Sequence, residues 1–171
     1  MLNRPRQAFS TVLDQPRFNT HVGYVLAVFI LATSVTLVLT APRPLSLVTY
    51  IFLSWISLVL MFYVMNLLCL LTARALGGGA GWKRQQLALV WGLYPMILVP
   101  FIGGLLLFGV SQATGEPISE LILWLSGGIG GLWSVGLTAL NLATVHGLSV
   151  QQGWISAWPV LLYLIGGLLA G

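Results

Sequence analysis

The sequence predicts an all-α fold: a polytopic transmembrane helical bundle of about five spans. Two observations carry this prediction. Between Leu121 and Gly171 there is no Asp, Glu, Lys or Arg, and a soluble domain needs charged side chains on its surface. The whole chain is 58% hydrophobic and only 6% charged, against roughly 25% charged residues in average soluble proteins. At about 1.5 Å per helical residue, the charge-free stretch can cross a hydrocarbon core about 30 Å thick at least twice.

Residues 1–20 are predicted to form a cytoplasmic N-terminal segment. Phe9, Val12 and Leu13 have the spacing of one helical face, which favours a short helix lying at the membrane interface. An unstructured tail is the alternative. The apolar run that follows is preceded by a long polar segment, so we expect it to be kept as an anchor and not cleaved.

Residues 21–171 are predicted to form one transmembrane domain. The predicted spans are 22–40, 47–71, 87–110, 118–142 and 154–170. The turn Pro42-Arg43-Pro44 separates the first two, and the run Gly77-Gly78-Gly79 lies in the loop before the third. This loop resembles a phosphate-binding loop superficially, but it follows a membrane helix and not a strand, so the sequence predicts a flexible loop.

Basic residues set the predicted orientation. With the N-terminus in the cytoplasm, the inner side holds Arg4, Arg6, Arg17, Arg74, Lys83 and Arg84. The outer side then holds Arg43 alone, together with the acidic Glu116 and Glu120. This bias follows the positive-inside rule and places the C-terminus outside. The tryptophans near span ends are typical of the aromatic belt at headgroup depth.

No catalytic, cofactor-binding or metal-binding residues are predicted. His21 and His146 do not form a metal-binding pair, and Cys69 is the single cysteine, so zinc and disulfide chemistry lack their usual ligands. The basic residues are too few and too localised for nucleic-acid binding. Arg74, Lys83 and Arg84 are candidate contacts to lipid headgroups at the inner leaflet.

Small residues are candidate contact points between helices. Gly127 and Gly131 form a Gly-x-x-x-Gly pattern, and Gly167 and Gly171 form another. Such faces let helices approach closely. Packing inside the bundle is one interpretation, and association with a partner or a second copy is the other.

The third span contains two proline residues, Pro95 and Pro100. Each lacks a backbone N–H, which predicts a kink and leaves carbonyl groups that need other donors. The asparagine side chains Asn66 and Asn141 lie inside spans. They are expected to form hydrogen bonds between helices, and contact with a substrate is the alternative.

Several motifs together resemble one known family. They are Leu13-Asp-Gln-Pro16-Arg-Phe18 before the first span, the glycine-rich basic loop, Gly92-Leu-Tyr94-Pro95 with Pro100, Trp133, and Thr144-Val-His146-Gly147-Leu-Ser149. Along the whole chain they resemble the Yip-domain family of five-span membrane proteins in its short bacterial form. The candidate family-motif residues are Gly92, Tyr94, Pro95, Pro100, Trp133, His146 and Ser149.

The resemblance implies a protein of membranes and not an enzyme. Eukaryotic relatives organise vesicle membranes and bind Rab proteins, whereas some bacterial members accompany ABC-type exporters. This chain lacks the Asp-Leu-Tyr-Gly-Pro motif and the long N-terminal region of the trafficking members, and it has Gln151-Gln152 where a lysine is expected. These departures count against a Rab partner.

The first functional hypothesis is therefore a non-enzymatic scaffold or accessory subunit of the bacterial cytoplasmic (inner) membrane. Its expected partners are membrane lipids and other membrane proteins or a second copy, with no nucleic acid, cofactor or identified small-molecule substrate. The alternative is a channel or a component of small-solute or ion transport, associated with an ABC-type exporter. A lipid-acting enzyme that uses His146 is the third hypothesis, and it lacks paired acid and base groups.

Overall fold

The computed structural model describes residues 23, 27–28, 30–31, 44–115 and 120–170. These parts of the chain form helices joined by short turns, with no β-strand among them. The elements are α3 (Pro44–Ala75), α4 (Trp82–Thr114), α5 (Glu120–His146), α6 (Val150–Ser156) and α7 (Trp158–Ala170). The predicted all-α fold is confirmed.

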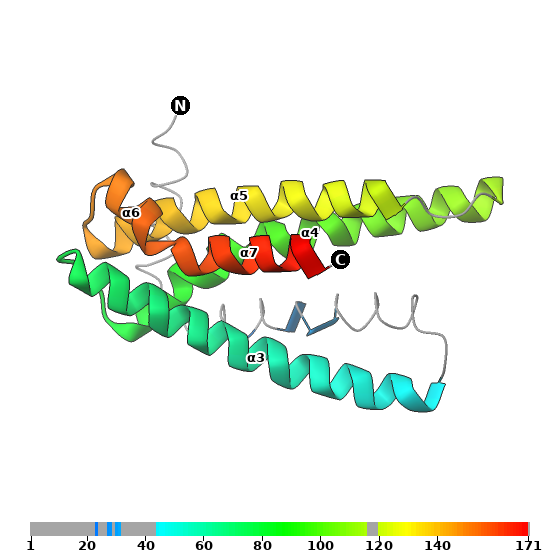
Figure 1. Ribbon diagram of the computed structural model, residues 1–171, viewed down its shortest axis with the longest axis horizontal. Helices are drawn as coiled ribbons and strands as arrows, with labels where there is room; N and C mark the ends of the chain where they lie inside the picture. The colour runs from blue at the N-terminus through cyan, green and yellow to red at the C-terminus, as the bar shows by residue number, and fades with distance from the viewer. Residues whose placement is uncertain (1–22, 24–26, 29, 32–43, 116–119, 171) are drawn as a thin grey trace.

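The helices are arranged around the pair α4 and α5, which pack side by side (Figure 1). Helix α7 lies against α5, and α3 runs at an angle to this group in the view of Figure 1. Short α6 closes one end, where it contacts both α5 and α3. This end therefore gathers the end of α3, the start of α4 and the end of α5.

Within the described parts of the chain, three helical segments are long and apolar enough to cross a membrane: Ile51–Ala75, Trp82–Thr114 and Trp124–His146. A shorter apolar helix covers Trp158–Gly167. The three long segments correspond to the second, third and fourth predicted spans, so the prediction of membrane helices is confirmed for these three. The shorter helix lies within the fifth predicted span, which stays a prediction. The first predicted span, 22–40, lies almost wholly outside the described residues, as do 1–20 and 116–119. The count of five spans and the orientation stay predictions.

Two boundaries differ from the sequence-based ranges. Helix α5 continues through His146, so the residue expected in a loop is the last residue of a helix. The segment predicted as one span, 154–170, is divided between α6 and α7 at Ala157. The side chain of Ser149 starts α6 by a capping box with Gln152, and Pro159 has no N–H to continue the ladder to the carbonyl of Ile155.

Helix α4 contains both Pro95 and Pro100 in its interior. Next to the first of them, the Met96 N–H donates to the Ser134 hydroxyl oxygen of α5 at 2.7 Å. A neighbouring helix thus bonds the backbone beside the proline, as the absence of water in the bilayer requires.

The core lies in the half of the bundle nearest α6. Buried residues of α4 run from Gln85 to Ile97, and the buried hydrophobic residues of α3 begin at Phe62. On α5 the buried stretch begins at Gly130. Side chains in the other half, including Leu106 of α4 and Leu121 of α5, are exposed, as expected for helices whose solvent is lipid.

Candidate functional site at the histidine end of the bundle

A buried histidine joins three helices at the end of the bundle closed by α6. His146 is 5% exposed and ends α5, whereas Gln85 lies in the first turn of α4 and is fully buried. The loop between α3 and α4 contacts the imidazole ring at Nδ1. We call the set Gly78, Gly79, Ala80, Gln85 and His146 the histidine clasp.

Both nitrogen atoms of the His146 ring are used inside the protein. The backbone N–H of Ala80 donates to Nδ1 at 3.3 Å, so Nδ1 is the unprotonated nitrogen. The hydrogen of the neutral ring is therefore on Nε2, which donates to the Gln85 Oε1 atom at 2.5 Å. Neither nitrogen is left to bind a metal or to transfer a proton to a substrate.

Two glycines of the loop have a structural reason: Gly78 lies close to this ring, and Gly77 has a positive φ. A Cβ atom at Gly78 would lie 2.6 Å from His146 Nδ1 and 2.8 Å from the Ala73 carbonyl oxygen. The Gly79 N–H donates to the His146 carbonyl oxygen at 3.3 Å, and Gly77 adopts φ +91°, a conformation that favours glycine. The loop predicted to be flexible thus makes defined hydrogen bonds to α5.

Helix α6 ties into the same end through its capping residues. The Ser149 N–H donates to Gln152 Oε1 at 3.0 Å, and the Gln152 N–H donates to Ser149 Oγ at 3.2 Å. The Gln152 Nε2 atom also donates to the Leu76 carbonyl oxygen at 3.4 Å. The family-motif residue Ser149 therefore positions α6 against the end of α3.

The three candidate lipid contacts lie around the histidine clasp. Arg74 is in the last turn of α3, Lys83 and Arg84 are in the first turn of α4, and all three are exposed. Glu120 supplies the only carboxylate side chain of the described residues, and it begins α5 at the opposite end of that helix.

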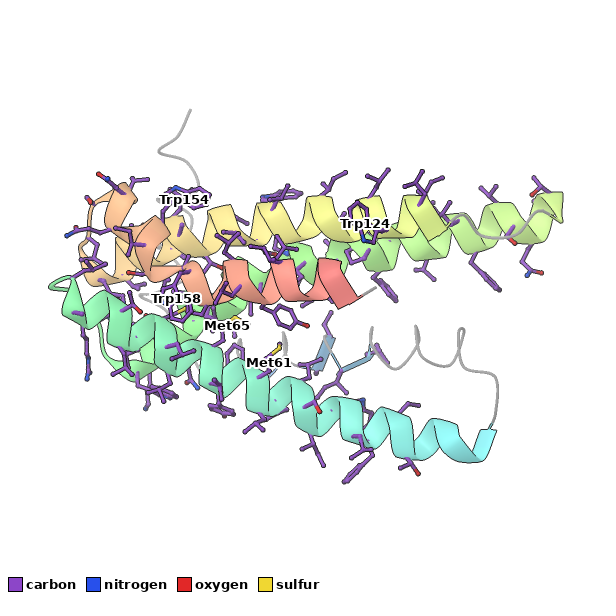
Figure 2. All side chains as sticks on the ribbon, in the orientation of Figure 1. Met61, Met65, Trp124, Trp154 and Trp158 are labelled. Atoms are coloured by element: carbon purple, nitrogen blue, oxygen red, sulfur yellow. The ribbon has the colours of Figure 1, made fainter. Side chains whose placement is uncertain are left out.

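Aromatic side chains lie at the same end. Trp82 is 37% exposed, and its ring stacks on Tyr63 with centroids 6.5 Å apart and an interplanar angle of 6°. The Trp158 Nε1–H donates to the Thr72 hydroxyl at 3.0 Å. Figure 2 shows Trp154 on α6 and Trp158 at the start of α7. Amphipathic rings of this kind are typical of headgroup depth.

The candidate contact glycines divide into two groups. A Cβ atom at Gly131 would overlap the side chain of Leu164 on α7, so this glycine packs inside the bundle. At Gly127 and Gly167 a Cβ atom would meet nothing within 4 Å. Gly171 lies outside the described residues.

The family-motif residues of α4 and α5 also have different surroundings. Gly92 is buried, and a Cβ there would lie 2.7 Å from the Cα atom of Thr138 on α5. Pro95 is buried, Pro100 is partly buried, and Tyr94 makes a tilted ring contact with Trp91. Trp133, by contrast, is 58% exposed.

Four polar side chains within the helices differ in hydrogen bonding: two have a partner on a neighbouring helix and two have none among the described residues. Asn141 Nδ2 donates to the Ala88 carbonyl oxygen at 3.1 Å, and Ser134 accepts from Met96. Asn66 is fully buried, and neither of its amide atoms has a hydrogen-bond partner among the described residues; the same holds for the buried Thr138 hydroxyl.

Sequence reasoning singled out His146 but missed Gln85. Gln85 is followed by Gln86 in a polar stretch at a helix start, and no pattern separates the buried glutamine from its neighbour. Thr138 and Ser134 were missed for a similar reason, because small hydroxyl residues are common in membrane helices.

Together these features define a helical integral membrane protein with a hydrogen-bonded, basic end. The family model described as the Yip1 domain matches residues 1–171. The chain therefore belongs to the Yip1 domain family, as its motifs suggested. No curated protein and no solved structure matches it significantly.

Proposed function

We propose that this protein is a non-enzymatic membrane scaffold or accessory subunit. It acts through contacts between its helices and those of partner membrane proteins or a second copy, and through the loops of the histidine end. The observation that carries the proposal is that no described side chain lies within 4 Å of a Cβ atom built at Gly127 or Gly167, on helices with exposed apolar side chains.

The surroundings of Gly127 fit a helix-docking face. Its pattern partner Gly131 is already covered by Leu164, whereas no described atom lies within 4 Å of a Cβ at Gly127 or Gly128. Trp124, one helical turn before Gly127, is 49% exposed. A small residue beside a large one leaves room that a second helix can enter, and close backbone approach drives helix association in lipid.

The role of His146 supports a non-enzymatic function. Both ring nitrogens bond to the protein itself, so the histidine serves the fold. The third hypothesis, a lipid-acting enzyme, would need this ring to reach a substrate. That hypothesis would stand again if His146→Ala kept its fold but lost a lipid-converting activity.

The experiment replaces Gly127 by Leu and measures assembly in mild detergent by crosslinking and by light scattering after size exclusion. Gly109→Leu is the matched control, because Gly109 also has nothing within 4 Å but lies on α4. We expect Gly127→Leu to weaken assembly about tenfold without lowering the unfolding temperature, and Gly109→Leu to leave both unchanged. Assembly that survives Gly127→Leu would refute the docking face.

We further propose the bacterial cytoplasmic membrane as the location, with the N-terminus and the histidine end inside. The support is the distribution of basic residues, six of seven on that side. A reporter that is active only in the cytoplasm, fused to the C-terminus, tests this orientation. An active fusion would place the C-terminus inside and overturn the proposal.

The second candidate function is a channel or a component of small-solute or ion transport, associated with an ABC-type exporter. The unpartnered amide of Asn66 and hydroxyl of Thr138 favour it, because buried polar groups in a membrane need partners such as water or a solute. A flux assay in liposomes with ions and small neutral solutes tests this function, and the absence of permeation would remove it.

A further inference from the structure

Among the described residues, no carboxylate side chain lies at the histidine end to balance its exposed cations. Arg74, Lys83 and Arg84 are exposed, and Glu120, the single carboxylate side chain of the described residues, is at the far end of α5. We propose that these three residues form a binding surface for the phosphate headgroups of anionic phospholipids, with His146 as the positioning residue. The inference rests on the proposed function, in that it names one partner of the histidine end.

The position of the cations on their helices supports an anionic ligand. Arg74 is in the last turn of α3, where the helix dipole favours a positive charge. Lys83 and Arg84 are in the first turn of α4, with no acidic residue there and no side-chain cap from Gly81. Two cations at a helix N-terminus are opposed by the dipole, and a bound anion relieves this repulsion.

The aromatic side chains identify the anion as a lipid headgroup. Trp82 directly precedes Lys83, is partly exposed, and stacks on Tyr63 of α3. An exposed indole on an apolar helix is favoured at the boundary between headgroups and hydrocarbon. The cations beside it are therefore at the depth of lipid phosphates, where each basic side chain attracts an anionic leaflet.

The histidine clasp holds the two cation-bearing segments together. Arg74 belongs to the turn that ends α3, and the loop leaves that turn through Gly78, whose N–H donates to the Ala73 carbonyl oxygen at 2.8 Å. The same loop donates a hydrogen bond to His146 from the Ala80 N–H, and His146 is hydrogen-bonded to Gln85 of α4. The imidazole is therefore one link, beside the stack of Trp82 on Tyr63, that fixes the position of Arg74 relative to the first turn of α4.

The test measures thermal unfolding of the full-length purified protein in detergent with phosphatidylglycerol or phosphatidylcholine added. We expect phosphatidylglycerol to raise the unfolding temperature in a saturable, salt-sensitive way, and phosphatidylcholine to have little effect. The triple variant Arg74→Gln, Lys83→Gln, Arg84→Gln should lose at least tenfold in apparent affinity for phosphatidylglycerol. Arg43→Gln, a charge loss predicted to lie on the opposite side, is the control and should keep the wild-type response.

Further arms separate the sources of negative charge. Inorganic phosphate should stabilise the protein far less than phosphatidylglycerol. Equal stabilisation by inorganic phosphate, by a polyglutamate peptide or by phosphatidylcholine would overturn the lipid assignment. An unchanged phosphatidylglycerol response in the triple variant would overturn the site.

The positioning role of His146 has its own readout. Asparagine can accept the Ala80 N–H through Oδ1, so His146→Asn should keep more of the phosphatidylglycerol response than His146→Ala at matched stability in phosphatidylcholine. Equal responses in the two variants would contradict the positioning role. Assembly is measured in parallel: loss of the lipid response with assembly retained separates this surface from the docking face at Gly127, and failure of both would refute the proposed function too.

Discussion

The two halves of the helical bundle are held in different ways. In the half near α6, α4 buries residues from Gln85 to Ile97 and contacts α5 through polar and small side chains. In the other half, Leu105, Leu106 and Val110 of the same helix are exposed at 46%, 67% and 58%. The open half of the helix is no less apolar than the buried half, so apolarity is not what separates the halves.

The difference shows what holds helices together in lipid. Hydrocarbon solvates a leucine side chain about as well as another helix does, so burial of apolar area gives little preference for packing. Close contact at small residues and hydrogen bonds between helices stabilise the packed state instead. Both are concentrated in the half near α6, in Gly92 against Thr138 and in the bonds of His146.

The largest effect is expected at the histidine clasp. His146→Ala removes a buried ring and leaves the Ala80 N–H and the Gln85 Oε1 atom without partners, at about 1–3 kcal/mol for each buried unsatisfied group. We expect a loss of about 2–5 kcal/mol in unfolding free energy, measured by thermal or denaturant unfolding in detergent. Phe108→Ala in the open half should cost much less, because Phe108 is 38% exposed. Equal losses at both sites would break the comparison.

The next effect uses two glycines of α4. At Gly92 a Cβ would overlap the Thr138 side chain, so Gly92→Ala should destabilise the protein by about 1–3 kcal/mol through overpacking. At Gly109 a Cβ meets nothing within 4 Å, so Gly109→Ala should be neutral or stabilising by up to about 1 kcal/mol through helix propensity. Thermal melts followed by circular dichroism measure the change in stability of each variant. A change in the same direction in both variants would contradict this account.

A smaller contrast is expected between two asparagines. Asn141→Leu removes a bond to the Ala88 carbonyl oxygen and should cost about 0.5–1.5 kcal/mol. Asn66→Leu removes an amide with no partner and should be neutral or stabilising. The same melts measure both. A clear loss of stability in Asn66→Leu would mean that this amide has a partner such as water or a solute, and would favour the transport function.

The smallest effect is expected at the cap of α6. Ser149→Ala removes the capping bond to the Gln152 N–H and should cost about 1 kcal/mol. Thr114→Ala is the matched control in the open half, since its hydroxyl donates to the Val110 carbonyl oxygen of its own helix. We expect less than about 0.5 kcal/mol there. A larger loss in Thr114→Ala than in Ser149→Ala would reverse the comparison.

The helices could be predicted from the sequence because their cause is local. Long apolar stretches without charge have to satisfy their own backbone groups in lipid, and only a helix does so within one segment. The ends of the helices were less predictable, as His146 and Ala157 show. The first depends on the turn at Gly147, and the second depends on Pro159 and on how α6 packs across the bundle end.

The candidate site could be predicted only in part. His146, Ser149, Arg74, Lys83 and Arg84 were identified from motif and charge, but not the partner of any of them. The sequence by itself determined the solvent of this protein, the helical fold and the family, because these follow from composition and from motifs within single segments. The tertiary structure decided which glycines are covered, which asparagine is bonded, and that Gln85 and Ala80 hold His146, because residues 61 positions apart meet only when the helices pack.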